Sequence, residues 1–433
     1  MNNNNNYTKK IYESIDEVLY TKVTNNGLTV FINKKKGFNK IFSSFVTNFG
    51  AYDIKFIPID EDEYIEVPYG VAHFLEHKMF EMPSGIDASN LFAELGADAN
   101  AYTDYNATAY VVSCTSNFEQ VIELLLDFVQ TPYFTDENVE KEKGIIIEEL
   151  NMYKDNPSDR LYNLLMRNMY KYNSRKEDVV GSIDSINNIS KEILYKCYST
   201  FYHPKNMYLC ISGDVDVDKT FALIEQNQSK KRFPIFKPLK CKYHIESNKV
   251  HRKSGSSSMD IVIPRVSLAV KYPVFEFDKD EMIKLECISK IILEYKFGFS
   301  SPNYQYMLDE DLVTGLSYTF LTDKCSSFMK FTANSYNPKL LINYLKEELI
   351  KMKNFTIDER SFENIKKGLL GSFIKAFDNV EFVSSDYVDY LFKNSNLFNI
   401  IEIINNIKIT DLQEFCKFIN DDSITYYIIK PKQ

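Results

Sequence analysis

Two histidines and a glutamate lie close together in the segment His73-Phe-Leu-Glu76-His77. Because the chain holds only five histidines, this arrangement is expected by chance in roughly a few of every thousand such sequences. On a helix, residues four apart share one face, so both imidazoles can reach one ion with Glu76 beside them. Imidazole is the commonest protein ligand for metals. The segment therefore predicts a metal site.

A catalytic zinc site needs a third protein ligand and an open position for water. The segment Glu140-Lys-Glu142-Lys-Gly-Ile-Ile-Ile-Glu148-Glu149 offers candidate carboxylates. Glu142 and Glu149 are seven residues apart, so on a helix they fall within about 20° of each other. One carboxylate can then be a ligand while the other supports a ligating histidine. Acidic runs more often form solvated helix faces, but the histidine pair favours ligation here.

The residues that carry this chemistry fall on two predicted helices, at 70–80 and 136–153. The second has a clear start, since Thr135 is followed by acidic residues in the first turn. The other elements predicted in this half are strands at 27–32, 41–49, 101–113 and 207–212 and helices at 88–95, 118–130, 158–171 and 190–201.

The pattern of elements begins again after a polar, proline-containing stretch at about 227–258. The elements predicted beyond it are strands at 266–272 and 316–320 and helices at 279–294 and 302–309. The run Phe134-Thr-Asp-Glu returns as Phe355-Thr-Ile-Asp-Glu, and Gly144-Ile-Ile-Ile returns as Gly368-Leu-Leu. This order predicts an internal duplication of roughly 200 residues, with chance similarity between two α+β halves as the alternative.

We divide the chain accordingly into four parts. They are a flexible Asn-rich leader (1–20), a metal-binding α+β domain (21–229), a linker (230–257) and a second, zinc-free α+β domain of the same fold (258–433).

The composition and charge argue against several classes of partner and location. A net charge of −9 and a pI near 5.3 argue against nucleic acid or an anionic membrane as the main partner. No apolar run is long enough to cross a membrane, and the start of the sequence lacks the apolar segment of a signal peptide. Seven scattered cysteines without a CxxC pair indicate a reducing compartment. We therefore expect a cytoplasmic protein.

Several motifs together resemble one family. HFLEH followed by EKEKGIIIEEL is similar to the pitrilysin/insulinase (inverzincin) zinc metallopeptidases, and in particular to short forms such as mitochondrial processing peptidase subunits and bacterial YmfH-type proteins. The resemblance extends over nearly the whole chain, through segments that begin at Asn100, Asp155, Phe201 and Gly213. It implies an α+β fold of two duplicated domains, each an antiparallel β-sheet flanked by helices, enclosing a peptide chamber.

The resemblance also implies roles for single residues. His73, His77 and Glu149 would bind Zn²⁺, and Glu76 would act as the general base. Glu142 would hold a zinc-bound imidazole in the correct tautomer. The alignment of EKGIIIEE favours Glu149 over Glu148 as the third ligand.

Substrate binding is the next implied role. Asn100 and Ala101 open the predicted strand at 101–113, where an extended peptide would add to the sheet by backbone pairing. From its residue type alone, Asn100 could equally be an ordinary turn residue before a strand.

The second half departs from the family pattern. Family members often supply an Arg and a Tyr to the oxyanion, with the Arg seven residues before the Tyr. Tyr318 matches the aromatic position, whereas Asp311 stands in place of the Arg, and the helix at 279–294 has no histidine. A carboxylate cannot stabilise an oxyanion. We therefore expect a heterodimer in which a paralogous partner brings the Arg/Tyr pair, and Tyr318 is either a substrate contact or an ordinary strand residue.

These expectations lead to one function and its alternatives. The first is a zinc-dependent metalloendopeptidase that hydrolyses short or unfolded peptides, such as precursor or leader peptides. The alternatives are a non-catalytic structural or assembly subunit and a peptide-binding accessory to a modifying enzyme.

Overall fold

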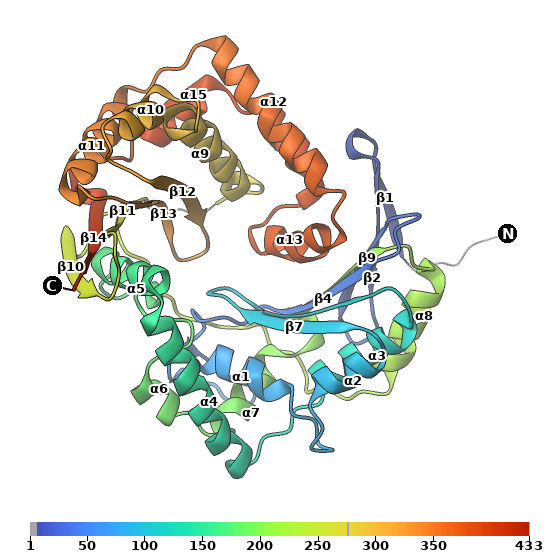
Figure 1. Cartoon of the computed structure of the whole chain (residues 1–433). Helices are drawn as coiled ribbons and strands as arrows, with labels where there is room; N and C mark the ends of the chain where they lie inside the picture. The colour runs from blue at the N-terminus through green and yellow to red at the C-terminus, as the bar shows by residue number, and fades with distance from the viewer. Residues whose placement is uncertain (1–6, 275–276, 433) are drawn as a thin grey trace.

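The computed structural model describes residues 7–274 and 277–432, and it contains two large β-sheets flanked by helices (Figure 1). The first sheet has seven strands. In sheet order they are β1 (Thr8–Tyr12), β2 (Glu17–Val23), β3 (Thr29–Lys34), β9 (Met207–Gly213), β4 (Ile41–Thr47), β8 (Thr108–Cys114) and β7 (Asp98–Thr103). All neighbours pair antiparallel except β3 and β9, which are parallel. β7 is an edge strand.

The second sheet has five strands and repeats the order of the first. They are β10 (Ser254–Met259), β14 (Ile424–Pro431), β11 (Arg265–Lys271), β13 (Ser327–Asn334) and β12 (Gly315–Thr322). This order matches β3-β9-β4-β8-β7, including one parallel pair, β10 with β14. The parallel pairs arise because the last strand of each half, β9 or β14, returns beside an early strand of that half, β3 or β10, after a long connection that contains helices. The predicted α+β class and internal duplication are confirmed, and the sheets are antiparallel apart from these pairs.

The helices repeat in the same order. Those of the first half are α1 (Val71–Met79), α2 (Ala88–Glu94), α3 (Phe118–Val129), α4 (Asp136–Asp155), α5 (Pro157–Met169), α6 (Ile183–Asn187), α7 (Lys191–Phe201) and α8 (Val217–Ser229). Those of the second half are α9 (Glu281–Phe297), α10 (Pro302–Asp309), α11 (Pro338–Lys351), α12 (Glu359–Ala376), α13 (Val380–Phe392), α14 (Ile400–Asn405) and α15 (Ile409–Cys416). α9 thus occupies the place of α1, and α12 the place of α4. Two short strands, β5 (Lys55–Phe56) and β6 (Ile65–Glu66), pair separately.

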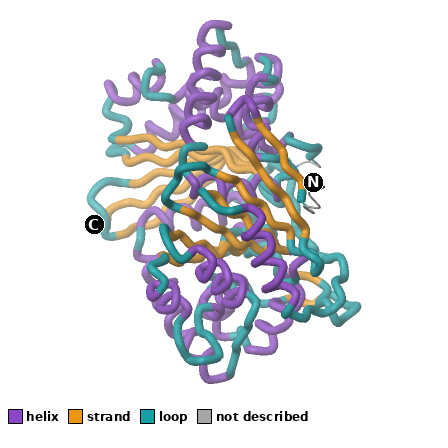
Figure 2. The backbone as a smooth tube through the Cα atoms, turned by 90° about the vertical axis from the view of Figure 1, so that its right-hand side faces the viewer, coloured by secondary structure: helices purple, strands orange, loops and turns teal. Residues whose placement is uncertain are grey.

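Each half places one helix on the sheet of the other half. α5 packs on β10, β11 and β14, and its counterpart α13 packs on β4 and β9. The Ser44 hydroxyl donates to the Ser384 carbonyl oxygen at 2.7 Å across one of these contacts. Figure 2 shows the strands gathered in the middle of the molecule with helices above and below them. The two sheets are therefore held together by exchanged helices as well as by the connecting chain.

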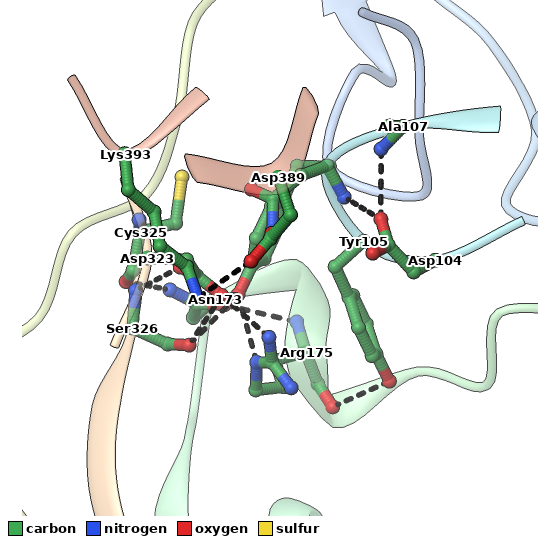
Figure 3. A network of polar contacts seen from close by, with 12 residues as sticks. Asp104, Tyr105, Ala107, Asn173, Arg175, Asp323, Cys325, Ser326, Asp389 and Lys393 are labelled. Carbon is green, nitrogen blue, oxygen red and sulfur yellow. Dashed lines mark hydrogen bonds and ion pairs between the residues drawn. The ribbon is translucent and has the colours of Figure 1, made fainter. Parts of the chain in front are cut away.

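Three segments differ from the sequence-based expectations. The run predicted as one strand at 101–113 is a hairpin of β7 and β8, because the Asp104 carboxylate accepts hydrogen bonds from the backbone N–H groups of Asn106 and Ala107 and so reverses the chain (Figure 3). The leader predicted at 1–20 contains β1 and the first residues of β2, while residues 1–6 lie outside the described residues. The linker predicted at 230–257 ends in the first residues of β10, which begins at Ser254, and before them it has only a bridge of Cys241 to Phe56.

A buried ion pair joins the two halves near these exchanged helices. Arg175, just after α5, contacts Asp323, in the turn between β12 and β13, with 2.5 Å between Nη2 and Oδ2 (Figure 3). Both side chains are only 7% exposed. The Arg175 guanidinium also donates to the hydroxyls of Tyr52 and Tyr162, at 2.8 and 2.9 Å. The Asp323 carboxylate accepts from the backbone N–H and hydroxyl of Ser326. The pair is therefore fully hydrogen-bonded across the junction of the halves.

We expect Asp323→Asn to lower the free energy of unfolding by about 3–5 kcal/mol, because it leaves the Arg175 charge buried without its counter-ion. Chemical denaturation followed by circular dichroism measures this. Glu414→Gln is the matched control, since its pair with Lys417 is exposed and should contribute less than about 1 kcal/mol. Equal, small changes in both variants would contradict the structural role assigned to the buried pair.

Candidate metal centre

Helix α1 presents His73, Glu76 and His77 because its other side is anchored in the core. Phe74 and Leu75 are fully buried in the core of the first half. Before the helix, Gly70 has a φ of +90°, and a Cβ there would lie 2.3 Å from the Val180 carbonyl oxygen. Only glycine lets the helix begin against this segment. The buried apolar face thus fixes the rotation of the helix, so His73, Glu76 and His77 point away from the core.

Helix α4 brings the carboxylates to this face. It begins with a capping box in which the Thr135 hydroxyl accepts from the Asn138 N–H and the Asn138 side chain accepts in return. Ile146 and Leu150 are buried on its core side. Glu142 and Glu149, predicted to share a face, both contact α1, while Glu148 is exposed.

His73, His77 and Glu149 come together as a group that could hold a metal. The His73 Nε2 atom lies 3.7 Å from Glu149 Oε1, and His77 Nε2 lies 3.3 Å from Glu149 Oε2. Ligands about 2.0–2.1 Å from a tetrahedral ion are roughly 3.3–3.4 Å apart. Across residues 7–274 and 277–432, this is the one group of three or more such side chains with ligand atoms within 4.8 Å of one another. The spacing and the two-nitrogen, one-oxygen donor set fit zinc.

A buried polar atom without a hydrogen bond supports the same fit. Glu149 Oε2 is buried and has no hydrogen bond, although His77 Nε2 lies 3.3 Å from it. Such atoms are costly in a folded protein unless a ligand, water or ion completes them. An ion held between the imidazoles would satisfy the carboxylate oxygen.

The pKa values of the three side chains are shifted by burial and by their mutual contacts. Burial, followed by the neighbouring His77, lowers the pKa of His73 to about 4, so its imidazole is neutral and can ligate. The adjacent His77 imidazole is the main cause that lowers the pKa of Glu149 to about 2. Burial lowers the pKa of His77, but its contacts with the Glu142 and Glu149 carboxylates outweigh burial and raise that pKa to about 10. A binding cation would therefore displace the His77 proton.

Neighbouring side chains hold His77, Glu149 and Glu76 in place. The Glu142 Oε1 atom lies 3.1 Å from His77 Nδ1, as expected for a residue that supports a ligating imidazole. The Tyr153 hydroxyl donates to Glu149 Oε1 at 2.9 Å. The Thr103 hydroxyl, from β7, donates to Glu76 Oε2 at 2.6 Å. Burial raises the pKa of Glu76, which suits a base that must also return a proton.

Sequence reasoning missed Tyr153 and Thr103. Tyr153 follows Glu149 by four residues on the predicted helix, so helical spacing alone could have indicated the contact. Thr103 reaches Glu76 only because β7 crosses beside α1, and no local pattern in the sequence signals this.

Two cavities meet at the centre along the edge strand. One, of about 460 Å³, is lined by His73, Glu149 and the wall residues Tyr105 and Tyr162. The other, of about 490 Å³, extends toward Glu142 and α2. Glu76, His77, Asn100 and Ala101 line both cavities. An open groove therefore runs along β7, past the residues predicted to bind a peptide.

Tyr318 lies elsewhere. On β12, it lines a separate cavity of about 580 Å³ between α9 and α12. Its hydroxyl donates to Glu294 Oε2 at 2.9 Å. This cavity occupies, in the second half, the place of the metal centre in the first. The structure does not bring Tyr318 into either cavity at the metal centre.

Comparison with known proteins decides the family. The model of the insulinase family (peptidase family M16) matches residues 61–182, and that of the M16 inactive domain matches residues 188–369. The chain is 37% identical over 425 residues to YmfH of Bacillus subtilis, described as an uncharacterized zinc protease, covering 97% of this chain and 98% of that one. The chain belongs to the M16 insulinase family.

A solved M16-like structure has the same fold, and a mitochondrial peptidase subunit is similar in sequence over part of the chain. A crystal structure of an M16-like peptidase from Alicyclobacillus acidocaldarius has a TM-score of 0.91 at 31% identity and covers 98% of this chain and 99% of its own. The β subunit of the mitochondrial processing peptidase of Caenorhabditis elegans is 29% identical over 161 residues, which cover 36% of this chain and 35% of that subunit. No described helix is both long and apolar enough to cross a bilayer.

Proposed function

We propose that this M16 protein is a zinc-dependent metalloendopeptidase acting on short or unfolded peptides. The main observation behind the proposal is that His73, His77 and Glu149 lie together beside Glu76. They line a cavity that also borders the edge strand β7. The relatives named zinc proteases support the same reaction class. His73, His77 and Glu149 would hold the zinc ion.

The roles of the chain's own residues follow from their positions. A bound zinc ion supplies a Lewis acid that polarises the peptide carbonyl and makes water more acidic. Glu76 takes the proton of the attacking water and passes it to the leaving amine. The Thr103 hydroxyl fixes one oxygen of Glu76, so the other is free for this transfer. Glu142 keeps the His77 ring in the ligating orientation.

The edge strand β7 is the peptide-binding element in this proposal. No strand among residues 7–274 and 277–432 pairs with its outer side, so its backbone can pair with an extended peptide. Asn100 and Ala101 line both cavities beside Glu76, so a peptide paired with β7 would lie next to Glu76. Backbone pairing tolerates many sequences, and it requires an extended chain. Short or unfolded polypeptides, including precursor or leader peptides, meet that requirement.

We further propose a paralogous partner that contributes an Arg/Tyr pair. Asp311 stands where the family often has the arginine, and Tyr318 is bonded to Glu294 in a separate cavity. This chain would therefore be the zinc-bearing subunit of a heterodimer. The seven cysteines are all free thiols, which supports the cytoplasm as its location.

A peptide-library digest tests the function and the partner together. We expect cleavage by the zinc-loaded chain to rise at least about tenfold when its paralogue is added, because an added oxyanion donor contributes about 10²–10³ in rate. A chelator should abolish it. Equal cleavage with and without the paralogue would remove the partner proposal, and no cleavage by the complex would remove the peptidase proposal.

The absence of an arginine at position 311 also favours a second candidate, a peptide-binding or assembly subunit that does not hydrolyse. A cell that depends on this gene separates the two. Glu76→Gln should fail to restore growth if hydrolysis is the role, and should restore it fully if binding is the role.

A further inference from the structure

Lys78 is a buried lysine beside the proposed zinc site that no step of the mechanism uses. It directly follows His77 on α1, and its side chain is 0% exposed. Burying an ammonium group costs several kcal/mol unless carboxylates or other acceptors compensate it. Lys78 lies in the last turn of α1, where a cation is favourable, but that small contribution does not offset complete burial.

Two carboxylates face the Lys78 ammonium. Glu81, three residues along, lies 2.6 Å away through Oε2 and would by itself be an ordinary local pair. Glu142, on α4, lies 3.7 Å away through its Oε2 atom. The other oxygen of Glu142 lies 3.1 Å from His77 Nδ1. Lys78 and His77 therefore contact opposite ends of the same carboxylate.

The charge around the centre shows what this contact can do. Glu76, Glu142 and Glu149 crowd together within one site, and like charges at this spacing repel. Within the described part of the chain, Lys78 is the one lysine or arginine that forms an ion pair with any of the three. Its positive charge faces the Oε2 atom of Glu142, while the Oε1 atom faces His77.

We propose that Lys78 is a positioning residue of the metal centre, which acts through Glu142 to hold the His77 imidazole in its ligating orientation. The inference rests on the proposed zinc site and goes beyond it, because it adds a residue that contacts neither metal nor substrate. Partners of ligating histidines typically contribute 10–100-fold to metal affinity, in order-of-magnitude terms. Lys78 acts one step further out.

The test measures zinc affinity by competition with a chromophoric chelator. We expect Lys78→Met to raise the zinc dissociation constant about tenfold or more. In a Glu142→Gln background, the same substitution should change it by less than about threefold, because the residue through which Lys78 acts is already altered. Lys417→Met is the control, since Lys417 forms an i,i+3 pair with Glu414 on an exposed helix end, and its affinity should equal that of the unchanged chain.

A second readout follows the geometry directly. In the cobalt-substituted chain, Lys78→Met should alter the visible absorption bands of Co²⁺, whereas Lys417→Met should not. Thermal unfolding shows whether each variant is folded. If Lys78→Met does not fold, Lys78→Gln, which can still bond to Glu81 without a charge, replaces it in both measurements.

Two results overturn the inference while leaving the zinc site intact. One is wild-type zinc affinity in the folded Lys78 variant. The other is an equal loss with and without Glu142→Gln, which would mean that Lys78 does not act through Glu142. An unchanged chain that binds no zinc would instead overturn the proposed function itself.

Discussion

Glu76→Gln is expected to lower the rate of peptide hydrolysis by about 10²–10⁴-fold, because an amide cannot accept the proton of the attacking water. Glutamine has the shape of glutamate and can still accept the Thr103 hydrogen bond that Glu76 accepts at 2.6 Å. The change should therefore appear in kcat. Zinc affinity should remain within about threefold of the original, since Glu76 is not one of the three grouped ligand residues. Steady-state kinetics on one cleaved peptide, with metal analysis of the same sample, measures both.

Glu94→Gln controls for the loss of a charge alone. Glu94 ends α2 and is exposed, so its substitution should leave kcat unchanged. A Glu76→Gln enzyme that keeps more than a tenth of its activity would show that another group is the base. Loss of zinc along with activity would show that the substitution disturbed the ligands instead.

Glu149→Gln is expected to weaken zinc binding by on the order of a thousandfold, because it removes the anionic ligand of the group. Altering a partner of a ligand already costs about 10–100-fold, and a direct ligand contributes more. The neighbouring Glu148→Gln is the matched control, with the same change of charge on the same helix but on its exposed side. Chelator competition on the two folded variants measures the difference. If the two variants bound zinc with similar affinity, or if only Glu148→Gln lost affinity, Glu149 would not be the third ligand.

Helical spacing in the sequence was enough to predict which side chains of the candidate site share a helix face. The i,i+4 spacing of His73 and His77 and the seven-residue spacing of Glu142 and Glu149 depend only on helix geometry, and both pairs lie on helices, α1 and α4. The choice of Glu149 over Glu148 agrees with the distances to both imidazoles. Their roles as zinc ligands stay predictions.

Long-range contacts were beyond the sequence patterns. The contact of Thr103 with Glu76, and that of Lys78 with Glu142, depend on how β7 and α4 pack against α1. The exchange of α5 and α13 between the sheets has no local signature either. The run at 101–113 is rich in Tyr, Thr and Val, which predicts one strand, but the Asp104 carboxylate binds the backbone N–H groups two and three residues further on and reverses the chain.

The duplication explains why the second half has a cavity where the first has its site. α9 and α12 repeat the positions of α1 and α4, but α9 carries no histidine, and the cavity between them is lined by Leu293, Phe320 and Ile365 among others. The same framework thus holds a polar centre in one half and a largely apolar space in the other. Side chains on a common scaffold, not the scaffold itself, decide the chemistry.

Anomalous X-ray scattering at the zinc edge from crystals grown with zinc tests the central claim most directly. We expect one peak per chain, about 2.0–2.2 Å from His73 Nε2, His77 Nε2 and a Glu149 oxygen, with a fourth position open to solvent. A chain with no peak there, or with zinc bound only at other side chains, would contradict the account.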